Sequence, residues 1–169
     1  MQSNEISRRV ALSEDYFRQG YNCAQSVFLA CCDLYGLTDK DLALRVSSSF
    51  GGGIGRMRSV CGATLGMFML EGLRSGNVEG TPEAKQRNYA QVQDLAARFR
   101  DEHGSLICAE ILGLAPRGES SGSPMLGPTP EPRSEEYYKK RPCVETVGSA
   151  VRIFLEHLGD ETGVSQENL

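Results

Sequence analysis

Four of the six cysteines of this chain stand far apart in the sequence, and each lies where a helix is predicted to begin. They are Cys23, Cys61, Cys108 and Cys143. The first follows a turn ending in Asn22, the second follows a glycine loop at residues 51–55, the third lies shortly after Ser105, and the fourth follows Pro142. Asn, Ser and Pro favour helix starts. Because a helix N-terminus carries free N–H groups and a partial positive charge, it stabilises a thiolate. This placement indicates sulfurs prepared for redox chemistry or metal ligation.

Four thiolates in one place would form a metal site. A tetrahedral sulfur site needs four deprotonated thiols, and soft thiolates select zinc or iron–sulfur clusters. One cysteine per helix, with four helix N-termini meeting at one end of a bundle, would supply them. The spacing matches no C-x-x-C pattern, and the alternative is four small core residues, since free cysteine is often buried. The helix placement favours the shared site. Cys31 and Cys32 lie outside this pattern and are interpreted as structural, with Cys31 in the core.

The glycine loop that precedes Cys61 invites a phosphate-binding interpretation, but it lacks a preceding strand and the Lys-Ser/Thr ending of a P-loop. A connector between helices is the simpler interpretation. A third use fits better, in which Gly53 and Gly55 let backbone N–H groups approach an anionic cluster beside Cys61. Arg56 and Arg58 would then lower the pKa of Cys61 or neutralise the cluster.

The composition predicts one globular domain over residues 1–169, because the chain has 169 residues and 40% apolar content. A net charge of −4 argues against nucleic-acid binding, which needs a basic stripe. The N-terminus has no apolar stretch typical of a secretory signal. The most apolar window, residues 60–70, is about half as long as a membrane span. We therefore expect a cytoplasmic protein without a transmembrane segment, in which reduced cysteines are metal ligands or redox thiols.

Apolar periodicity predicts an all-α bundle of about six or seven helices and no substantial sheet. The expected helices cover residues 4–18, 23–35, 38–48, 61–73, 81–103, 106–112 and 142–158. Gly36, Gly104 and Gly159 should end three of them, and His103 and His157 should act as C-terminal caps. The predicted core includes Val27, Leu42, Val46, Leu65, Phe68, Leu95, Phe99, Val147, Val151 and Phe154.

Two segments are expected to lie outside the core. Residues 115–133 hold five of the seven prolines together with several Gly and Ser, which predicts a flexible surface insertion. The pair Tyr137 and Tyr138 could anchor the chain again after this insertion. Residues 160–169 form a polar tail that we expect to be frayed.

The isolated cysteines and the segment Cys-Gly-Ala-Thr-Leu-Gly at residues 61–66 resemble the C-GCAxxG-C-C family of putative redox-active proteins. The segment Gly-Tyr-Asn-Cys-Ala-Gln at residues 20–25 is similar to the family's opening segment. The resemblance implies that Cys23, Cys61, Cys108 and Cys143 carry the function and that Gly62, Ala63 and Gly66 are motif positions. Members tend to be shorter, which implies that the Pro-rich segment is an insertion.

Three functions follow from these residues. The first is a redox protein in which the four cysteines converge on one iron–sulfur cluster, or less readily on zinc, for electron transfer or sensing with an unidentified partner. The second is a thiol–disulfide protein without a cofactor, in which pairs of the same cysteines cycle. The third is a structural zinc or a pair of disulfides that staples the bundle. We favour the first, because four solitary cysteines converge more naturally on one centre than on an exchange pair.

Overall fold

The computed structural model describes residues 2–115 and 127–164, and within them the chain is helical with no β-strand. The elements are α1 (Ser3–Arg18), α2 (Cys23–Leu29), η1 (Cys32–Tyr35), α3 (Lys40–Ser47), η2 (Ser48–Phe50), α4 (Gly62–Ser75), α5 (Pro82–His103), α6 (Cys108–Ile111), α7 (Glu135–Lys140) and α8 (Cys143–Val164), where η denotes a 3₁₀-helix. An isolated antiparallel bridge joins Val60 to Ile107. The prediction of an all-α domain is confirmed.

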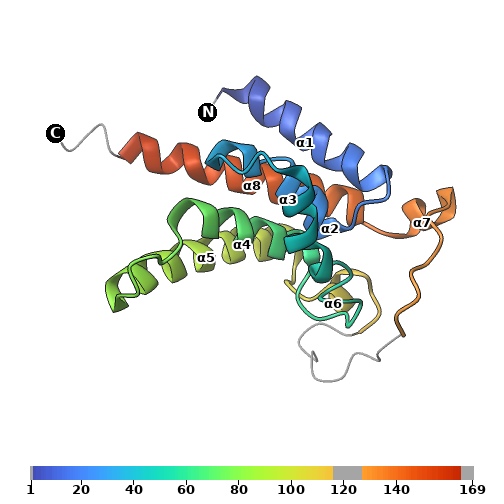
Figure 1. The fold of residues 1–169 in the computed structure, drawn as a ribbon. Helices are drawn as coiled ribbons and strands as arrows, with labels where there is room; N and C mark the ends of the chain where they lie inside the picture. Colours follow the sequence, from blue (N-terminus) through green and yellow to red (C-terminus); the bar gives the residue numbers. More distant parts are fainter. Residues whose placement is uncertain (1, 116–126, 165–169) are drawn as a thin grey trace.

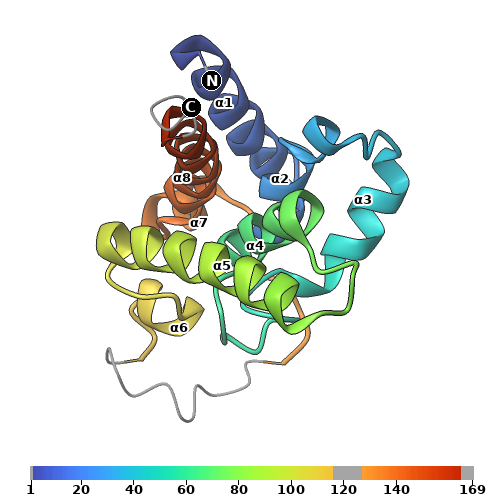
Figure 2. The same ribbon diagram turned by 90° about the vertical axis from the view of Figure 1, so that its left-hand side faces the viewer.

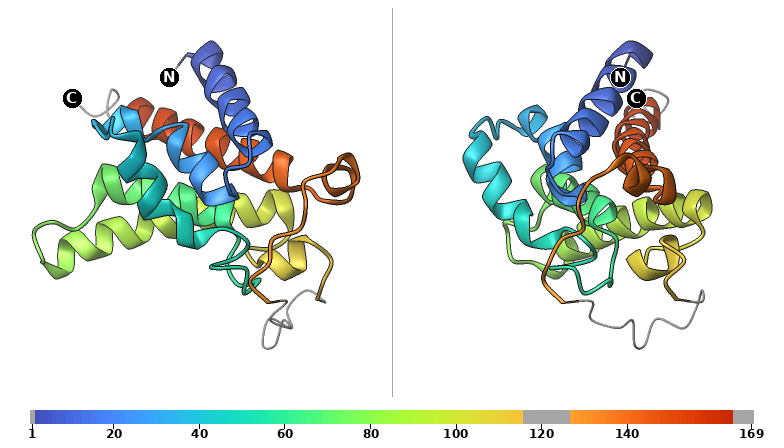
Figure 3. Two further views of the ribbon diagram at one scale, coloured as in Figure 1. Left: turned by 45° about the vertical axis from the view of Figure 1, so that its right-hand side comes forward. Right: turned by 90° about the vertical axis from the view of Figure 1, so that its right-hand side faces the viewer.

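The helices form a bundle around α2 (Figures 1 and 2). α1 packs against α8, α4 packs against both α2 and α5, and α2 also contacts α1, α3 and α8. The starts of α2, α4 and α8 point toward the end of the bundle where α6 and α7 lie (Figure 3). This arrangement sets several helix N-termini close together at one end.

Most of the predicted core is confirmed. The fully buried positions include Val27, Leu95, Phe99, Val147, Val151 and Phe154, whereas Leu65 and Phe68 are partly buried. The prediction was wrong for α3, where Leu42 is 46% and Val46 is 44% exposed. This short helix flanks the bundle and turns its small residues Ala43 and Ser47 inward instead.

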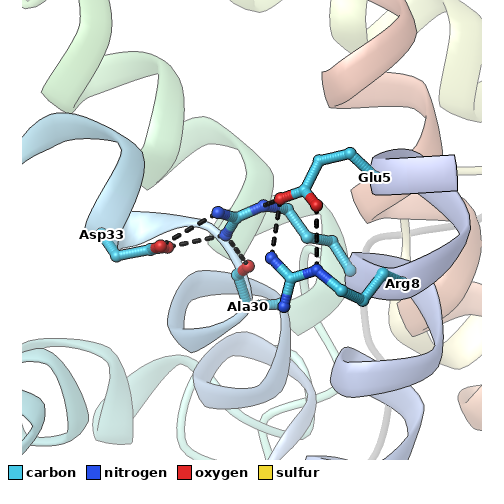
Figure 4. A network of polar contacts seen from close by, with 5 residues as sticks. Glu5, Arg8, Ala30 and Asp33 are labelled. Carbon is cyan, nitrogen blue, oxygen red and sulfur yellow. Dashed lines mark hydrogen bonds and ion pairs between the residues drawn. The ribbon is translucent and has the colours of Figure 1, made fainter. Parts of the chain in front are cut away.

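The second predicted helix is interrupted, because α1 contacts it at a buried arginine. Arg9 lies on α1 and is only 5% exposed. Its Nη1 donates to the carbonyl of Ala30 at 2.6 Å and to Asp33 at 2.7 Å, while its Nε donates to Glu5 at 2.7 Å (Figure 4). At this point α2 ends, Cys31 takes a φ of −140°, and the chain continues as η1. Gly36 ends η1 with a φ of 77°, as expected for a left-handed cap.

The last helix is longer than predicted. α8 continues through Gly159 to Val164, so the first part of the expected tail is helical. Asp160 pairs with Arg98 of α5 at 2.7 Å, which ties this extension to the bundle. His157 therefore does not cap a helix end, and its Nδ1 lies 3.1 Å from Asp94 Oδ2. His103 does occupy the last position of α5, before Gly104.

The region of the predicted insertion is described in part. Residues 116–126 lie outside the described residues, as do residues 165–169 of the expected tail. Residues 127–133 have no regular secondary structure and lead into α7, a helix that the sequence did not reveal. Tyr138 of α7 packs edge-on against Phe17 at 6.3 Å, consistent with the expected anchor. Among the described helices, none is long and apolar enough to cross a membrane.

Two aromatic residues of α5 provide a test of the packing. Phe99 is fully buried, so Phe99→Ala should lower the free energy of unfolding by about 3–5 kcal/mol, measured by urea denaturation. Tyr89 lies on the same helix but is 60% exposed, so Tyr89→Ala should change it by less than about 0.5 kcal/mol. Equal losses from the two changes would contradict the observed orientation of α5.

Candidate functional site

The four isolated cysteines line one cavity of about 70 Å³, which we call the cysteine cavity. Cys23, Cys108 and Cys143 are the first residues of α2, α6 and α8, and Cys61 immediately precedes α4. Cys31 and Cys32 are buried in the core and do not line this cavity. The structure describes all six cysteines, and each carries a free thiol. Within the described part of the chain, no three His, Cys, Asp or Glu side chains are placed to hold a metal ion.

A capping box fixes the position of Cys23 at the start of α2. The side chain of Asn22 accepts a hydrogen bond from the Gln25 N–H at 3.0 Å, and the Gln25 side chain accepts one from the Asn22 N–H at 3.0 Å. Asn22 Nδ2 also donates to the carbonyl of Ser48 at 2.8 Å. These bonds set the helix start and tie it to the segment that leads into the glycine loop.

Two glycines of the Cys-Gly-Ala-Thr-Leu-Gly motif allow α4 to lie directly against α2. A Cβ atom at Gly62 would collide with the sulfur of Cys23 and would lie 2.8 Å from the carbonyl oxygen of Phe50. A Cβ atom at Gly66 would lie 2.8 Å from the Ala24 carbonyl oxygen and 2.9 Å from Val27 Cβ. These approaches are shorter than real Cβ atoms tolerate. The motif glycines therefore bring the start of α4 beside Cys23.

A short pairing of two backbone segments places Cys108 beside Cys61. The N–H of Cys61 donates to the carbonyl of Leu106 at 2.7 Å, and the N–H of Cys108 donates to the carbonyl of Ser59 at 2.7 Å. These bonds flank the isolated bridge between the two segments. Ser105, which was expected to cap the short helix, instead accepts from the Ile107 N–H at 2.9 Å and lies two residues before the N-cap position, Ile107.

The glycine loop follows a left-handed path beside the cavity. Residues 52–56 all have positive φ, and Arg58 follows with a φ of 62°. A Cβ atom at Gly53 would lie 2.7 Å from Cys108 Cβ, so glycine is required there. Gly55 was expected to approach the cysteines, but the cavity is lined by Gly52 instead, and the nearest atom to a Cβ at Gly55 is the Ser49 carbonyl at 3.9 Å. Non-glycine residues in this region carry backbone strain, which is typical of functional sites.

Arg58 lies against one of the cavity cysteines. Its side chain is 6% exposed, and Nη1 lies 3.7 Å from the sulfur of Cys108. Its Nε is buried and has no hydrogen-bond partner among the described residues. Arg56 does not line the cysteine cavity and donates to the carbonyl of Gly127 at 2.6 Å.

Several residues that sequence reasoning missed complete the wall of the cysteine cavity. Arg133 and Arg141 line it from either side of α7, together with Tyr137. Arg133 donates from Nη2 to the Tyr21 carbonyl at 2.8 Å, and its guanidinium lies 4.1 Å from the ring centre of Phe17. No motif or periodicity marks these residues in the sequence. They reach the cavity only because α7 folds back onto α1.

The thiols are less acidic than their helix positions suggested. Burial raises the pKa of Cys61, Cys108 and Cys143, the last to about 12, and repulsion from Cys23 raises each of them further. The N–H groups of Ala63 and Thr64 act against this rise at Cys61, and Arg58 does so at Cys108. Burial outweighs the favourable field of the helix start. Without a bound cation these three thiols stay protonated at neutral pH.

Two glycines of α4 test the close approach to α2. Gly66→Ala should lower the free energy of unfolding by about 1–3 kcal/mol, because its methyl group would overpack against Ala24 and Val27. Gly72→Ala is the matched control, since a Cβ atom there would meet nothing within 4 Å, and it should raise stability by about 0.4–1 kcal/mol. Denaturant titration measures both, and a stabilising Gly66→Ala would contradict the packing.

The raised pKa values predict slow alkylation of the reduced, metal-free protein. At pH 8, Cys143 should react with iodoacetamide far more slowly than in the urea-unfolded chain, measured by peptide mass spectrometry, because only thiolates react. The rate should rise as pH approaches 12. The stability that the protonated thiol contributes should be present below pH 9, where the unfolded thiol is also protonated, and lost as pH rises toward 12. Equal rates in the folded and unfolded chains at pH 8 would contradict this prediction.

Comparison with known proteins gives one match. A family model described as "Putative redox-active protein (C_GCAxxG_C_C)" matches residues 21–157, a range that contains all four cysteines of the cavity. No curated protein and no solved structure matches the chain. The match covers more than half of the sequence and includes the motif at residues 61–66. The chain therefore belongs to the C_GCAxxG_C_C family.

Proposed function

We propose that the protein is a redox protein whose four cavity cysteines hold an iron–sulfur cluster for electron transfer or sensing. The observation that supports this most is the meeting of Cys23, Cys61, Cys108 and Cys143, from four separate helix starts, at one cavity. Thiolate sulfur is the donor type that iron–sulfur clusters use. A bound cluster would supply one-electron transfer, and the chain would supply its sulfur ligands and its surroundings.

The charges around the sulfurs favour thiolates only when a cation is present. Burial and repulsion from neighbouring sulfurs raise the pKa of Cys61, Cys108 and Cys143 and so hold these three thiols neutral in the metal-free chain. Metal ions remove these protons on binding. Arg58, Arg133 and Arg141 line the same cavity and would offset the negative charge of the ligated sulfurs. The buried Arg58 Nε, which lacks a partner, is an available donor at this site.

The second candidate is a thiol–disulfide protein that uses the same cysteines. The observation in its favour is that the cavity cysteines are close enough to interact electrostatically, since Cys23 and Cys108 each interact with the other three. Oxidation of one pair would release two protons and pass two electrons to an acceptor disulfide, which would become a dithiol. A structural zinc is the third candidate.

Metal analysis of protein purified without oxygen distinguishes these functions. We expect iron and acid-labile sulfide in stoichiometric amounts, with visible absorption from sulfide-to-iron charge transfer. Replacing any one of the four cavity cysteines by Ser should abolish or sharply lower the iron content, because each sulfur is a ligand. Cys32→Ser is the matched control, since Cys32 is buried like Cys61 and Cys108 but lies outside the cavity.

Three results would contradict the cluster. Zinc without sulfide would favour the structural site. Metal-free protein whose thiols are consumed in pairs during a redox titration would favour thiol–disulfide exchange. Iron that is retained in all four Ser variants would place the metal elsewhere in the chain.

A further inference from the structure

A second cavity, of about 350 Å³, opens beside the cysteine cavity, and we call it the arginine cavity. The two cavities share walls formed by Asn22, Gly52, Arg58, Arg133, Tyr137 and Arg141. Any molecule in the arginine cavity would therefore lie next to the residues that surround the cysteine sulfurs.

The arginine cavity is cationic in a chain whose net charge is −4. Arg56, Arg58, Arg133 and Arg141 line it, and among the described residues the one carboxylate in its wall belongs to Glu131. The side chains of Arg58 and Arg141 are 6% and 15% exposed, so their charges are largely removed from water. Buried charges of one sign require partners, which indicates a site for an anion.

Glu131 shows how this site holds a carboxylate. Arg141 Nη2 donates to both carboxylate oxygens of Glu131 at 2.6 Å. Arg56 Nη2 lies 3.5 Å and Arg58 Nη2 lies 3.9 Å from Glu131 Oε1. Burial acts to raise the pKa of Glu131, but the hydrogen bonds and charges of these arginines outweigh it, so the pKa is lowered and the carboxylate stays ionised.

Glu131 is a replaceable occupant of the site. It belongs to the segment before α7 and its side chain is 43% exposed, unlike the arginines that it contacts. The backbone around it has no helical hydrogen bonds to hold it in place. A carboxylate from solution can therefore compete with it for Arg141 at the cost of an exposed side chain turning toward water.

Arg58 links the two cavities. Its Nη1 contacts the sulfur of Cys108 at 3.7 Å, and its Nη2 lies 3.9 Å from the carboxylate of Glu131. Its buried Nε has no partner in the part of the chain that the structure describes. An anion that replaced Glu131 would approach the same guanidinium and could use the unpaired donor.

We propose that the arginine cavity binds a small carboxylate-bearing molecule, which displaces Glu131 from Arg141, Arg56 and Arg58 and thereby lies beside the cysteine cavity. The internal carboxylate acts as a competitor that fills the site when the ligand is absent. This proposal does not depend on which cofactor the cysteines carry.

Isothermal titration calorimetry with malonate as the probe tests it, on the full chain as purified and at low ionic strength. Glu131→Gln should raise malonate affinity about tenfold or more, because the competing charge is removed. Glu135→Gln is the matched control, since Glu135 is an exposed carboxylate of α7 that pairs with Lys139 and lines neither cavity. It should leave the affinity unchanged.

A second pair of variants tests the arginines. In the Glu131→Gln background, Arg141→Gln should lower malonate affinity about tenfold or more, whereas Arg45→Gln, at an exposed surface pair with Asp41, should not. Circular dichroism shows whether Arg141→Gln folds, and if it does not, Arg56→Gln replaces it with the same expected direction.

The proposal is overturned if Glu131→Gln binds malonate no more tightly than the parent chain, or if Glu135→Gln gains as much. It is also overturned if the arginine changes leave the affinity unaltered. Inorganic phosphate serves as the second probe, and binding of phosphate without malonate would overturn the carboxylate assignment.

Discussion

The close approach of α4 to α2 is the contact on which the site depends. At Gly62 and Gly66 the two helices meet with no room for a methyl group, so the start of α4 lies against the sulfur of Cys23. The residue before that start is Cys61, whose backbone pairs with the segment that carries Cys108. One packing contact and two backbone hydrogen bonds thus assemble three of the four sulfurs. The fourth sulfur belongs to Cys143, the first residue of α8, and α8 packs against both α2 and α4.

Burial of the sulfurs shapes their chemistry more strongly than their helix positions do. A helix N-terminus favours a thiolate, but its partial charge competes here with removal from water and with repulsion between neighbouring sulfurs. The pKa of Cys143 rises to about 12 as a result. Thiols with a raised pKa stay protonated at neutral pH and are therefore weak nucleophiles until a cation or an oxidant reacts with them. Arg58, Arg133 and Arg141 line the same cavity and would balance the negative charge of thiolates bound to a metal.

Arg58 is the residue that joins sulfur chemistry to the adjacent cationic cavity. It is held on a left-handed backbone with a φ of 62°, a conformation that costs about 1–3 kcal/mol for a residue other than glycine. Its guanidinium lies between the sulfur of Cys108 and the carboxylate of Glu131. Electrostatic interactions strengthen in a buried environment, so a change of charge in one cavity should alter the electrostatic energy of groups in the other. The strained loop therefore places the charge of Arg58 next to both cavities.

The sequence by itself determined the features that rest on local chemistry. Asn22 caps its helix where expected, and Gly36 and Gly104 end their elements. Apolar periodicity located Val27, Leu95 and Phe99 in the core, because capping and amphipathicity act within a few residues. The isolated cysteines and the Cys-Gly-Ala-Thr-Leu-Gly segment also identified the family.

Only the tertiary structure decided the features that depend on partners distant in the sequence. Arg9 meets the end of α2 and coincides with its break, and the flank of the bundle exposes Val46 despite its helical spacing. Arg133 and Arg141 line the cavity from either side of α7, and Arg58 contacts the sulfur of Cys108. The raised pKa values of Cys61, Cys108 and Cys143 follow the same rule, since burial and neighbouring charges are set by packing between elements and not by the order of residues along the chain.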